Sequence, residues 1–214
     1  MVQIQQTKTL TLSECLKLPE TEPASEYIND QIIQKPRPQG KHSRIQCELV
    51  PAINVAVKNQ KIALAFPELR CTWGGRSIVP DVTVFTWERI PVDANGDVAN
   101  VFETYPEWTI EILSPDPSQT KVTGNILHCL KNGTKMGLLI APMGDSILIY
   151  YPGKQPEILA KPEELLPVPD WAAELRLTVG DLFGWLKLGS ENLKRSKKET
   201  PPYPPRGERK KDQL

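Results

Sequence analysis

The chain has 214 residues, of which 26 are Lys or Arg and 26 are Asp or Glu, so its formal net charge is zero. The overall charge therefore points to no nucleic-acid, membrane or polycationic partner. The apolar fraction of 39% and the charged fraction of 24% are ordinary for a soluble globular protein. A chain of this length can bury a core large enough to fold without disulfides or a structural metal.

The cysteines and the N-terminus narrow the class further. The four cysteines form no CxxC pair and only His42 and His128 could join them, which argues against a zinc site. The N-terminal sequence lacks a long apolar stretch and so predicts neither a signal peptide nor a membrane span. We expect a cytoplasmic protein with reduced thiols and no membrane partner.

The first third of the chain predicts a short helix and a hairpin. Residues 11–18 open with a threonine that is followed three residues later by Glu14, the pattern of a capping box. In residues 26–36 two short β-prone runs meet at Asn29 and Asp30, which favours a β-hairpin.

A long amphipathic helix is predicted next, over residues 42–59. Its apolar residues recur every fourth position and so form one face of about four helical turns. They are Ile45, Leu49, Ile53 and Val57.

Strands dominate the middle of the chain. Residues 61–66, 76–85 and 107–114 are rich in β-favouring residues and are predicted strands. The polar connection 88–106 is predicted to be a surface loop.

The remaining elements complete an α/β pattern. Residues 120–132 are predicted to form a second long helix that ends at Gly133. Residues 136–142 and 146–153 are two further predicted strands, and 177–186 is predicted to be a terminal helix. This order predicts an α/β sandwich around a mixed sheet.

Two carboxylates interrupt the predicted strands. Asp81 lies within an apolar run, and Glu111 separates Ile110 from Ile112. A buried acid is costly unless it is paired, hydrogen-bonded or bound to a cation. Two such acids on adjacent strands would form an oxygen-rich pocket suited to Mg²⁺ or Mn²⁺. The alternative is that both acids point outward on a half-solvated face of the sheet.

The segments VPDVTVF and EWTIEILSP, at residues 79–85 and 107–115, carry a family resemblance. With the helix and apolar strand that follow, they resemble the Uma-type (Uma-two) family of bacterial endonuclease-like proteins, within the restriction-endonuclease superfamily. The likeness covers roughly residues 10–188. It implies a restriction-endonuclease-like α/β core, a mixed sheet flanked by helices, with an N-terminal helix and β-hairpin.

The resemblance also implies a set of site residues. Asp81 and Glu111 match the metal-binding acids, and the carbonyl of Ile112 would be a further metal ligand. Glu26 matches an acidic position of the family's hairpin, and His42 matches the histidine that heads its long helix. For Glu26 and His42 the simpler interpretation is an exposed acid and a polar residue near a helix start, without a special role.

The lysine of the superfamily signature is displaced in this chain. Its usual position, two residues after the second acid, is occupied by Leu113. Lys121, one helical turn before Asn125, is the candidate replacement, and we expect its ammonium to approach the carboxylate of Glu111 directly or through one water. The alternative is a solvated lysine in the first helical turn.

Two hypotheses for function follow from the resemblance. One is a DNA endonuclease that depends on Mg²⁺ or Mn²⁺ and acts as a homodimer, with DNA as its partner. The other is a catalytically inactive DNA-binding or interaction protein on the same scaffold. A purely structural dimer has no feature in its favour beyond a large apolar sheet.

Residues 1–188 are predicted to form the domain and 189–214 a separate tail. The tail holds eight Lys or Arg, four acids and four prolines, so its net charge is +4 and it has almost nothing to bury. Such a composition predicts disorder. The tail could hold DNA loosely or serve only as a solubilising terminus.

Overall fold

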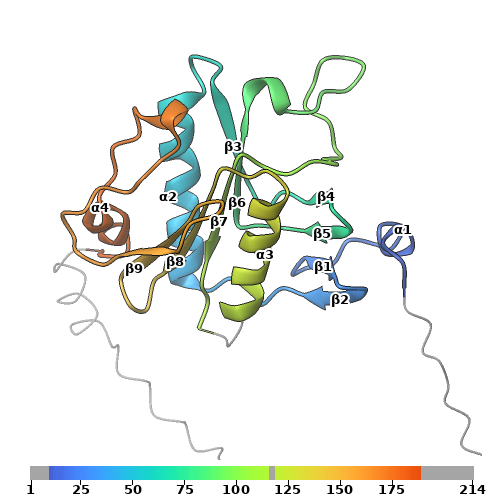
Figure 1. The fold of residues 1–214 in the computed structure, drawn as a ribbon, viewed down its shortest axis with the longest axis horizontal. Coiled ribbons are helices and arrows are strands. Elements are labelled where there is room, and N and C mark those ends of the chain that lie inside the picture. Colours follow the sequence, from blue (N-terminus) through green and yellow to red (C-terminus); the bar gives the residue numbers. More distant parts are fainter. Residues whose placement is uncertain (1–9, 116–118, 189–214) are drawn as a thin grey trace, which may run out of the picture.

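The computed structural model describes residues 10–115 and 119–188 (Figure 1). The predicted tail, 189–214, lies outside them. The helices are α1 (Leu12–Cys15), α2 (Gly40–Val57), α3 (Gln119–Lys131) and α4 (Val179–Gly184), with short 3-10 turns at Trp87–Arg89 and Asp170–Ala172. The strands are β1 (Ser25–Ile28), β2 (Gln31–Gln34), β3 (Ala63–Pro67), β4 (Cys71–Trp73), β5 (Arg76–Ile78), β6 (Val82–Thr86), β7 (Trp108–Ile112), β8 (Met136–Ala141), β9 (Ser146–Tyr150) and β10 (Glu157–Leu159).

The strands form two sheets. The larger is mixed and has the order β10-β9-β8-β7-β6-β3, in which only β7 and β8 run parallel. The smaller, β2-β1-β5-β4, is antiparallel throughout. The chain leaves the smaller sheet after β5 and enters the larger one at β6. Residues 79–81 therefore connect the two sheets.

This connection corrects the predicted strand 76–85. The structure divides it into β5 and β6, which belong to different sheets. Pro80 explains the division, because it has no N–H for a sheet ladder and restricts the residue before it. The strands β4 and β10 were not predicted, and each has only three residues.

Most other predicted elements are confirmed, and their local causes are visible. Thr11 and Glu14 form the capping box of α1. The hairpin turns at Asn29 and Asp30, whose φ angles of 50° and 61° suit Asn and Asp. Gly133 follows α3 with a φ of 122°, a conformation that glycine adopts without strain.

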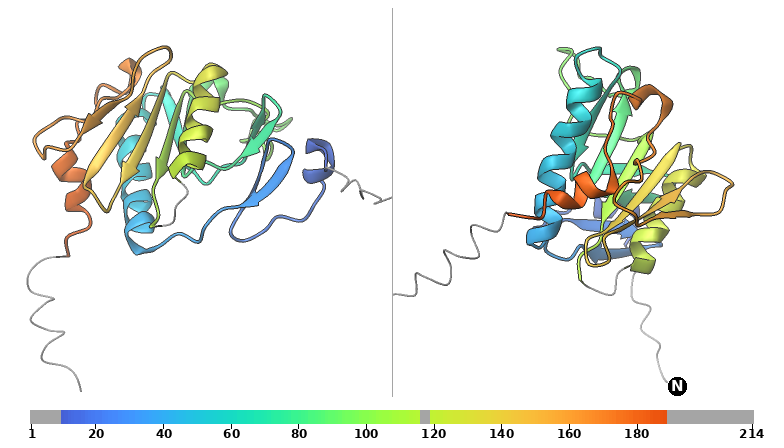
Figure 2. Two further views of the ribbon diagram at one scale, coloured as in Figure 1. Left: turned by 60° about the horizontal axis from the view of Figure 1, so that its bottom comes forward. Right: turned by 90° about the vertical axis from the view of Figure 1, so that its left-hand side faces the viewer.

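The larger sheet carries a helix on each face. Figures 1 and 2 show α2 and α3 on opposite sides of it. The α2 face is the main core, where Ile45, Leu49 and Ile53 pack against alternate residues of β6 to β9. The opposite face is covered by α3 and by the smaller sheet, through smaller apolar clusters. No helix in the described ranges is long and apolar enough to cross a membrane.

Candidate active site

A cavity of about 450 Å³ lies beside the segment that joins the two sheets. Its walls come from the β1–β2 hairpin, the first turn of α2, the end of β7 and the first turns of α3. All the site residues expected from the sequence line it. They are Glu26, His42, Asp81, Glu111, Ile112 and Lys121.

Asp81 and Glu111 reach the cavity from the residue just before β6 and from β7, respectively. In the antiparallel pair of β6 and β7, Thr83 lies opposite Thr109. Two residues further along, the same register places Asp81 opposite Glu111, on the face turned away from α2. Both are 3% exposed. Asp81 directly precedes β6, and Glu111 lies on the neighbouring strand β7, so the two acids share one face of the sheet as expected, although Asp81 itself belongs to the connecting segment.

Every oxygen of the Asp81 carboxylate has a donor. Oδ1 accepts from the ammonium of Lys35 at 2.7 Å. Oδ2 lies 3.0 Å from Nε2 of His42 and accepts from the backbone N–H of Ile112 at 2.7 Å. Burial alone would raise the pKa of Asp81, but Lys35 and His42 favour the ionised form and hold the pKa well below its usual value.

Lys35 is the residue that sequence reasoning missed. It follows β2 directly, and its ammonium also donates to the carbonyl of Val79 at 2.6 Å. Burial disfavours the charged ammonium, but the carboxylates of Asp81 and Glu111 outweigh burial and raise the pKa of Lys35. It therefore carries a fixed positive charge beside the two central acids.

Lys121 has a different partner from the one expected. Its ammonium lies 2.9 Å from Oε2 of Glu26, and this is the ion pair that it makes within the described residues, so Lys121 does not pair directly with Glu111. Asn125, one turn further along α3, donates to the same Glu26 carboxylate at 3.2 Å. The two residues share a helix face, as expected. That face points to the hairpin and not to β7.

Side chains also hold the backbone of the connecting segment, in addition to the backbone hydrogen bond that the carbonyl of Asp81 accepts from the N–H of Glu68 at 3.1 Å. The N–H of Val79 donates to Oε1 of Glu26 at 3.0 Å, and the carbonyl of Val79 accepts from Lys35. The carbonyl of Asp81 accepts from the side-chain amide of Gln46 at 2.7 Å. Buried backbone groups need such partners. The same contacts fix the direction of the Asp81 side chain.

The sequence profile of the Uma2 family, described as "Putative restriction endonuclease", matches residues 12–180. The chain belongs to the Uma2 family. No protein with a curated description matches it.

A solved structure is similar to this Uma2 protein in both sequence and fold. The chain is 61% identical to a protein from Anabaena variabilis ATCC 29413, titled a "putative nuclease belonging to DUF820". The match covers 83% of this chain and 99% of that one, with a TM-score of 0.82. The expected restriction-endonuclease-like fold is thereby confirmed, and the scaffold is nuclease-like.

The position where the superfamily signature places lysine serves packing in this Uma2 chain. Leu113 joins a cluster between α3 and β8 that includes Ile126 and Leu139. A lysine at position 113 would place its charge against these apolar side chains, which is costly. A cation for the site must therefore come from another element, and Lys35 and Lys121 are the two lysines that line the cavity.

Glu111 is a buried acid of the cavity whose surroundings disfavour its charged form, although Lys35 and the backbone of Asp81 favour it. Burial and the neighbouring charge of Asp81 raise its pKa well above the usual value for a glutamate. A cation placed between the two acids would relieve both effects. The Oδ1 atom of Asn125 also lacks a partner at this cavity: it is buried and accepts no hydrogen bond from the part of the chain that the structure describes.

These residues fit a hydrated divalent ion better than a fully protein-ligated one. Within residues 10–115 and 119–188, no group of three or more His, Cys, Asp and Glu side chains is arranged to hold a metal. Two carboxylates and a backbone carbonyl are nevertheless a hard oxygen set, and Mg²⁺ is usually held by one or two carboxylates while keeping several waters. The donor set of Asp81, Glu111 and Ile112 therefore suits Mg²⁺ or Mn²⁺ and does not suit zinc.

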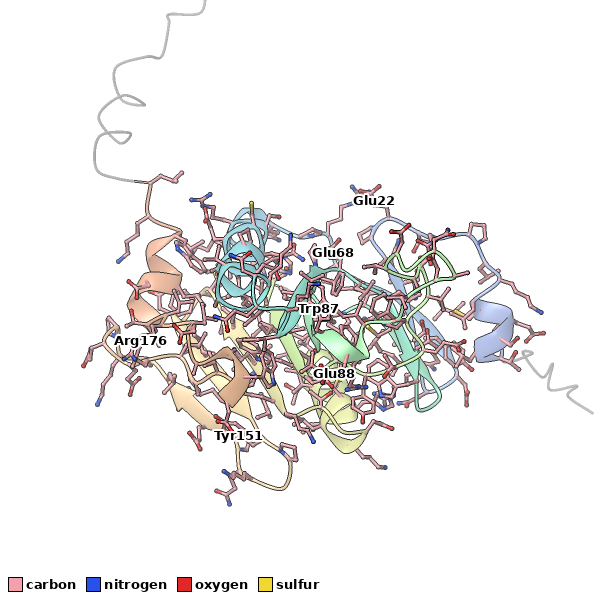
Figure 3. All side chains as sticks on the ribbon, turned by 90° about the horizontal axis from the view of Figure 1, so that it is seen from above. Glu22, Glu68, Trp87, Glu88, Tyr151 and Arg176 are labelled. Carbon is pink, nitrogen blue, oxygen red and sulfur yellow. The ribbon has the colours of Figure 1, made fainter. Side chains whose placement is uncertain are left out.

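The rim of the cavity carries charges of both signs. Arg37, which lies between two prolines, and the acids Glu22 and Glu68 are exposed and line the same cavity. Figure 3 labels Glu22 and Glu68 among the side chains. The mixture allows a phosphate to approach along Arg37 and Lys121 while the acids remain available to cations.

Proposed function

We propose that this Uma2 protein is a nuclease that hydrolyses phosphodiester bonds of DNA with Mg²⁺ or Mn²⁺. The observation that carries the proposal is the pair of buried acids, Asp81 just before β6 and Glu111 on β7, that enter one cavity side by side. Buried ionisable groups with perturbed pKa values that gather in a cavity are typical of active sites. Membership of the Uma2 family supports the same conclusion.

In this proposal Asp81, Glu111 and the carbonyl of Ile112 would hold the divalent ion. The ion would supply the Lewis acidity that activates water and neutralises charge on the phosphate. The other side chains prepare this site. His42 and the N–H of Ile112 orient the Asp81 carboxylate, and Glu26 fixes the backbone N–H of Val79 beside it. Such supporting contacts keep metal ligands in place.

DNA is the proposed substrate because of the chemistry around the cavity as well as the family. Arg37 on the rim can contact a backbone phosphate, and phosphate contacts supply most of the sequence-independent affinity for DNA. The acids at the bottom of the cavity would repel a phosphate unless a cation neutralised them. Substrate binding should therefore depend on the divalent ion.

The test is a nicking assay on supercoiled plasmid with Mg²⁺ or Mn²⁺. Wild type should convert it to open circles, and Asp81→Asn should slow this by roughly 100-fold or more, because it removes a ligand charge while keeping the shape of the side chain. Asp145→Asn is the matched control: this exposed turn residue has a φ of 43°, which Asn tolerates. Metal-independent nicking, or equal rates for wild type and Asp81→Asn, would contradict the proposal. DNA binding without cleavage would favour the inactive alternative.

A further inference from the structure

The cavity contains two lysines, and each is paired with a different acid. Lys35 contacts Asp81 at 2.7 Å, and Lys121 contacts Glu26 at 2.9 Å. Asp81 is a proposed ligand of the divalent ion, whereas Glu26 supports the connecting backbone. Moving Lys35 would therefore free an oxygen of a proposed metal ligand, whereas moving Lys121 would free an oxygen of a supporting acid.

We infer that Lys35, and not Lys121, is the lysine that serves this site, and that its contact with Asp81 is exchanged for the divalent ion. In the structure the Lys35 ammonium contacts Oδ1 of Asp81. With a divalent ion held by Asp81, the ammonium would leave this oxygen and would be free to contact the attacking water or the phosphate. The inference rests on the proposed function.

The bonding of Asp81 shows which oxygen can be exchanged. Oδ2 holds both His42 and the backbone N–H of Ile112, so replacing these donors would leave a buried N–H without a partner. Oδ1 holds the Lys35 ammonium. Releasing a lysine costs less, since an ammonium on a flexible stem can reach other acceptors or water. An ion would therefore enter at Oδ1.

The Lys35 side chain also has room to move away from Asp81. Its side chain is 16% exposed, against 4% for Asp81, and it lines the cavity. Its ammonium already donates to the carbonyl of Val79. Keeping that bond, it can turn away from Oδ1 and remain at the edge of the cavity, where the reacting phosphate would lie.

Lys121 supports the connecting segment through Glu26, although its own side chain, 21% exposed, is less buried than that of Lys35. Its partner Glu26 is 1% exposed and also binds Asn125 and the N–H of Val79. Removing one partner from a buried ion pair leaves an uncompensated charge, which is strongly unfavourable. The Lys121 ammonium therefore stays on Glu26 when an ion enters beside Asp81.

The first experiment is a calorimetric titration of the full chain with Mn²⁺. Lys35→Met should bind Mn²⁺ about tenfold tighter than wild type or more, because the competing charge is gone. Lys121→Met should bind within about threefold of wild type, since that charge lies on another acid. If the two variants changed the affinity for Mn²⁺ equally, the effect would come from net charge alone and the inference would be overturned. Unchanged or weaker Mn²⁺ binding by Lys35→Met would also overturn it.

A second measurement uses wild type alone, in case Lys35→Met does not fold. In protein labelled with ¹⁵N at the lysine side chains, the Lys35 ammonium should give a protected signal, assigned by its loss in Lys35→Arg. Added Mg²⁺ should shift or broaden this signal and leave that of Lys121 in place. A Lys35 signal that is unchanged while Mg²⁺ binds would overturn the exchange.

Nicking separates this inference from the proposed function. Lys35→Met should bind Mn²⁺ yet cleave plasmid roughly 100-fold more slowly than wild type, whereas Lys121→Met should lose less than about tenfold. A larger loss in Lys121→Met would overturn the assignment of the lysine. If wild type cleaves with no metal ion, the proposed function fails, and the titration and the lysine signal still decide whether Lys35 yields Asp81 to the ion.

Discussion

The two faces of the larger sheet differ in what they bury. Toward α2, alternate residues of the central strands are apolar and fully buried, among them Val84, Ile110 and Leu138. On the opposite face the same strands bury Asp81 and Glu111 beside a polar cavity. The face toward α2 excludes charged side chains, as protein cores usually do, whereas the opposite face buries two carboxylates side by side.

The difference assigns separate tasks to the two faces. Apolar burial of the α2 face stabilises the domain, whereas the buried acids cost free energy unless they are paired. Such a cost persists in natural proteins mainly where function requires it. Substitutions on the α2 face should therefore destabilise the protein, and some in the cavity should stabilise it.

The largest effect is expected for Ile110→Ala on the α2 face. Ile110 is fully buried, and truncating such a side chain leaves a cavity that costs about 2–5 kcal/mol. Urea unfolding followed by circular dichroism should show this loss at any pH between 5 and 8. A loss below about 1 kcal/mol would mean that the α2 face is not the main source of stability.

Asp81→Asn should come next and should depend on pH. Breaking a buried ion pair costs about 3–5 kcal/mol when one partner is removed, and the amide retains part of this by keeping hydrogen bonds. The pKa of Asp81 in the folded protein lies well below 3.8, the ordinary pKa of an aspartate. Its contribution is therefore fully present above that value and is lost as pH falls toward the folded-state pKa. Urea midpoints of variant and wild type should converge as the pH is lowered below about 3.8; a constant difference would contradict the ion pair.

Glu111→Gln should have the opposite sign. Because the folded-state pKa of Glu111 is raised, its ionisation opposes folding at neutral pH, and an amide removes that penalty. We expect a gain of roughly 1–2 kcal/mol in metal-free protein. The gain should vanish as pH falls below 4.5, the ordinary pKa of a glutamate, because the carboxyl is then neutral in both the folded and the unfolded protein. Thermal unfolding across pH measures it, and a destabilised variant at pH 7 would show that Glu111 is well paired.

The sequence predicts the α2 face better than the cavity face. Periodic apolar residues such as Ile45 and Leu49 indicate a buried helix face directly, and their burial is confirmed. The division at Pro80 into strands of two sheets is harder to predict. Both halves of the segment are β-prone, and only long-range pairing, Tyr27 with Ser77 and Thr83 with Thr109, separates them.

The same contrast holds within the candidate site. Asp81 and Glu111 could be predicted because an acid in an apolar run is conspicuous, and Lys121 is a candidate because it is the first lysine after Leu113 in the sequence. Lys35 gave no such signal, since a lysine after a half-exposed strand has the pattern of a solvated residue. Its contact with Asp81 spans 46 positions and depends on how the hairpin packs. Local sequence patterns do not contain that information.

The smallest effect is expected for an ion pair with the same length as the one in the cavity. Arg44 and Glu48 on α2 lie 2.7 Å apart, the distance between Lys35 and Asp81, but their side chains are 45% and 35% exposed. Water and salt screen such a pair, so Glu48→Gln should cost no more than about 0.5 kcal/mol and less in 1 M salt. Asp81→Asn should keep most of its cost in the same salt, because the cavity shields the pair from counterions. Urea unfolding of both variants at low and high salt compares the two ion pairs. Their lengths are the same, so a difference in cost reflects their burial. If Glu48→Gln cost as much as Asp81→Asn, burial would not be what gives the cavity charges their energy.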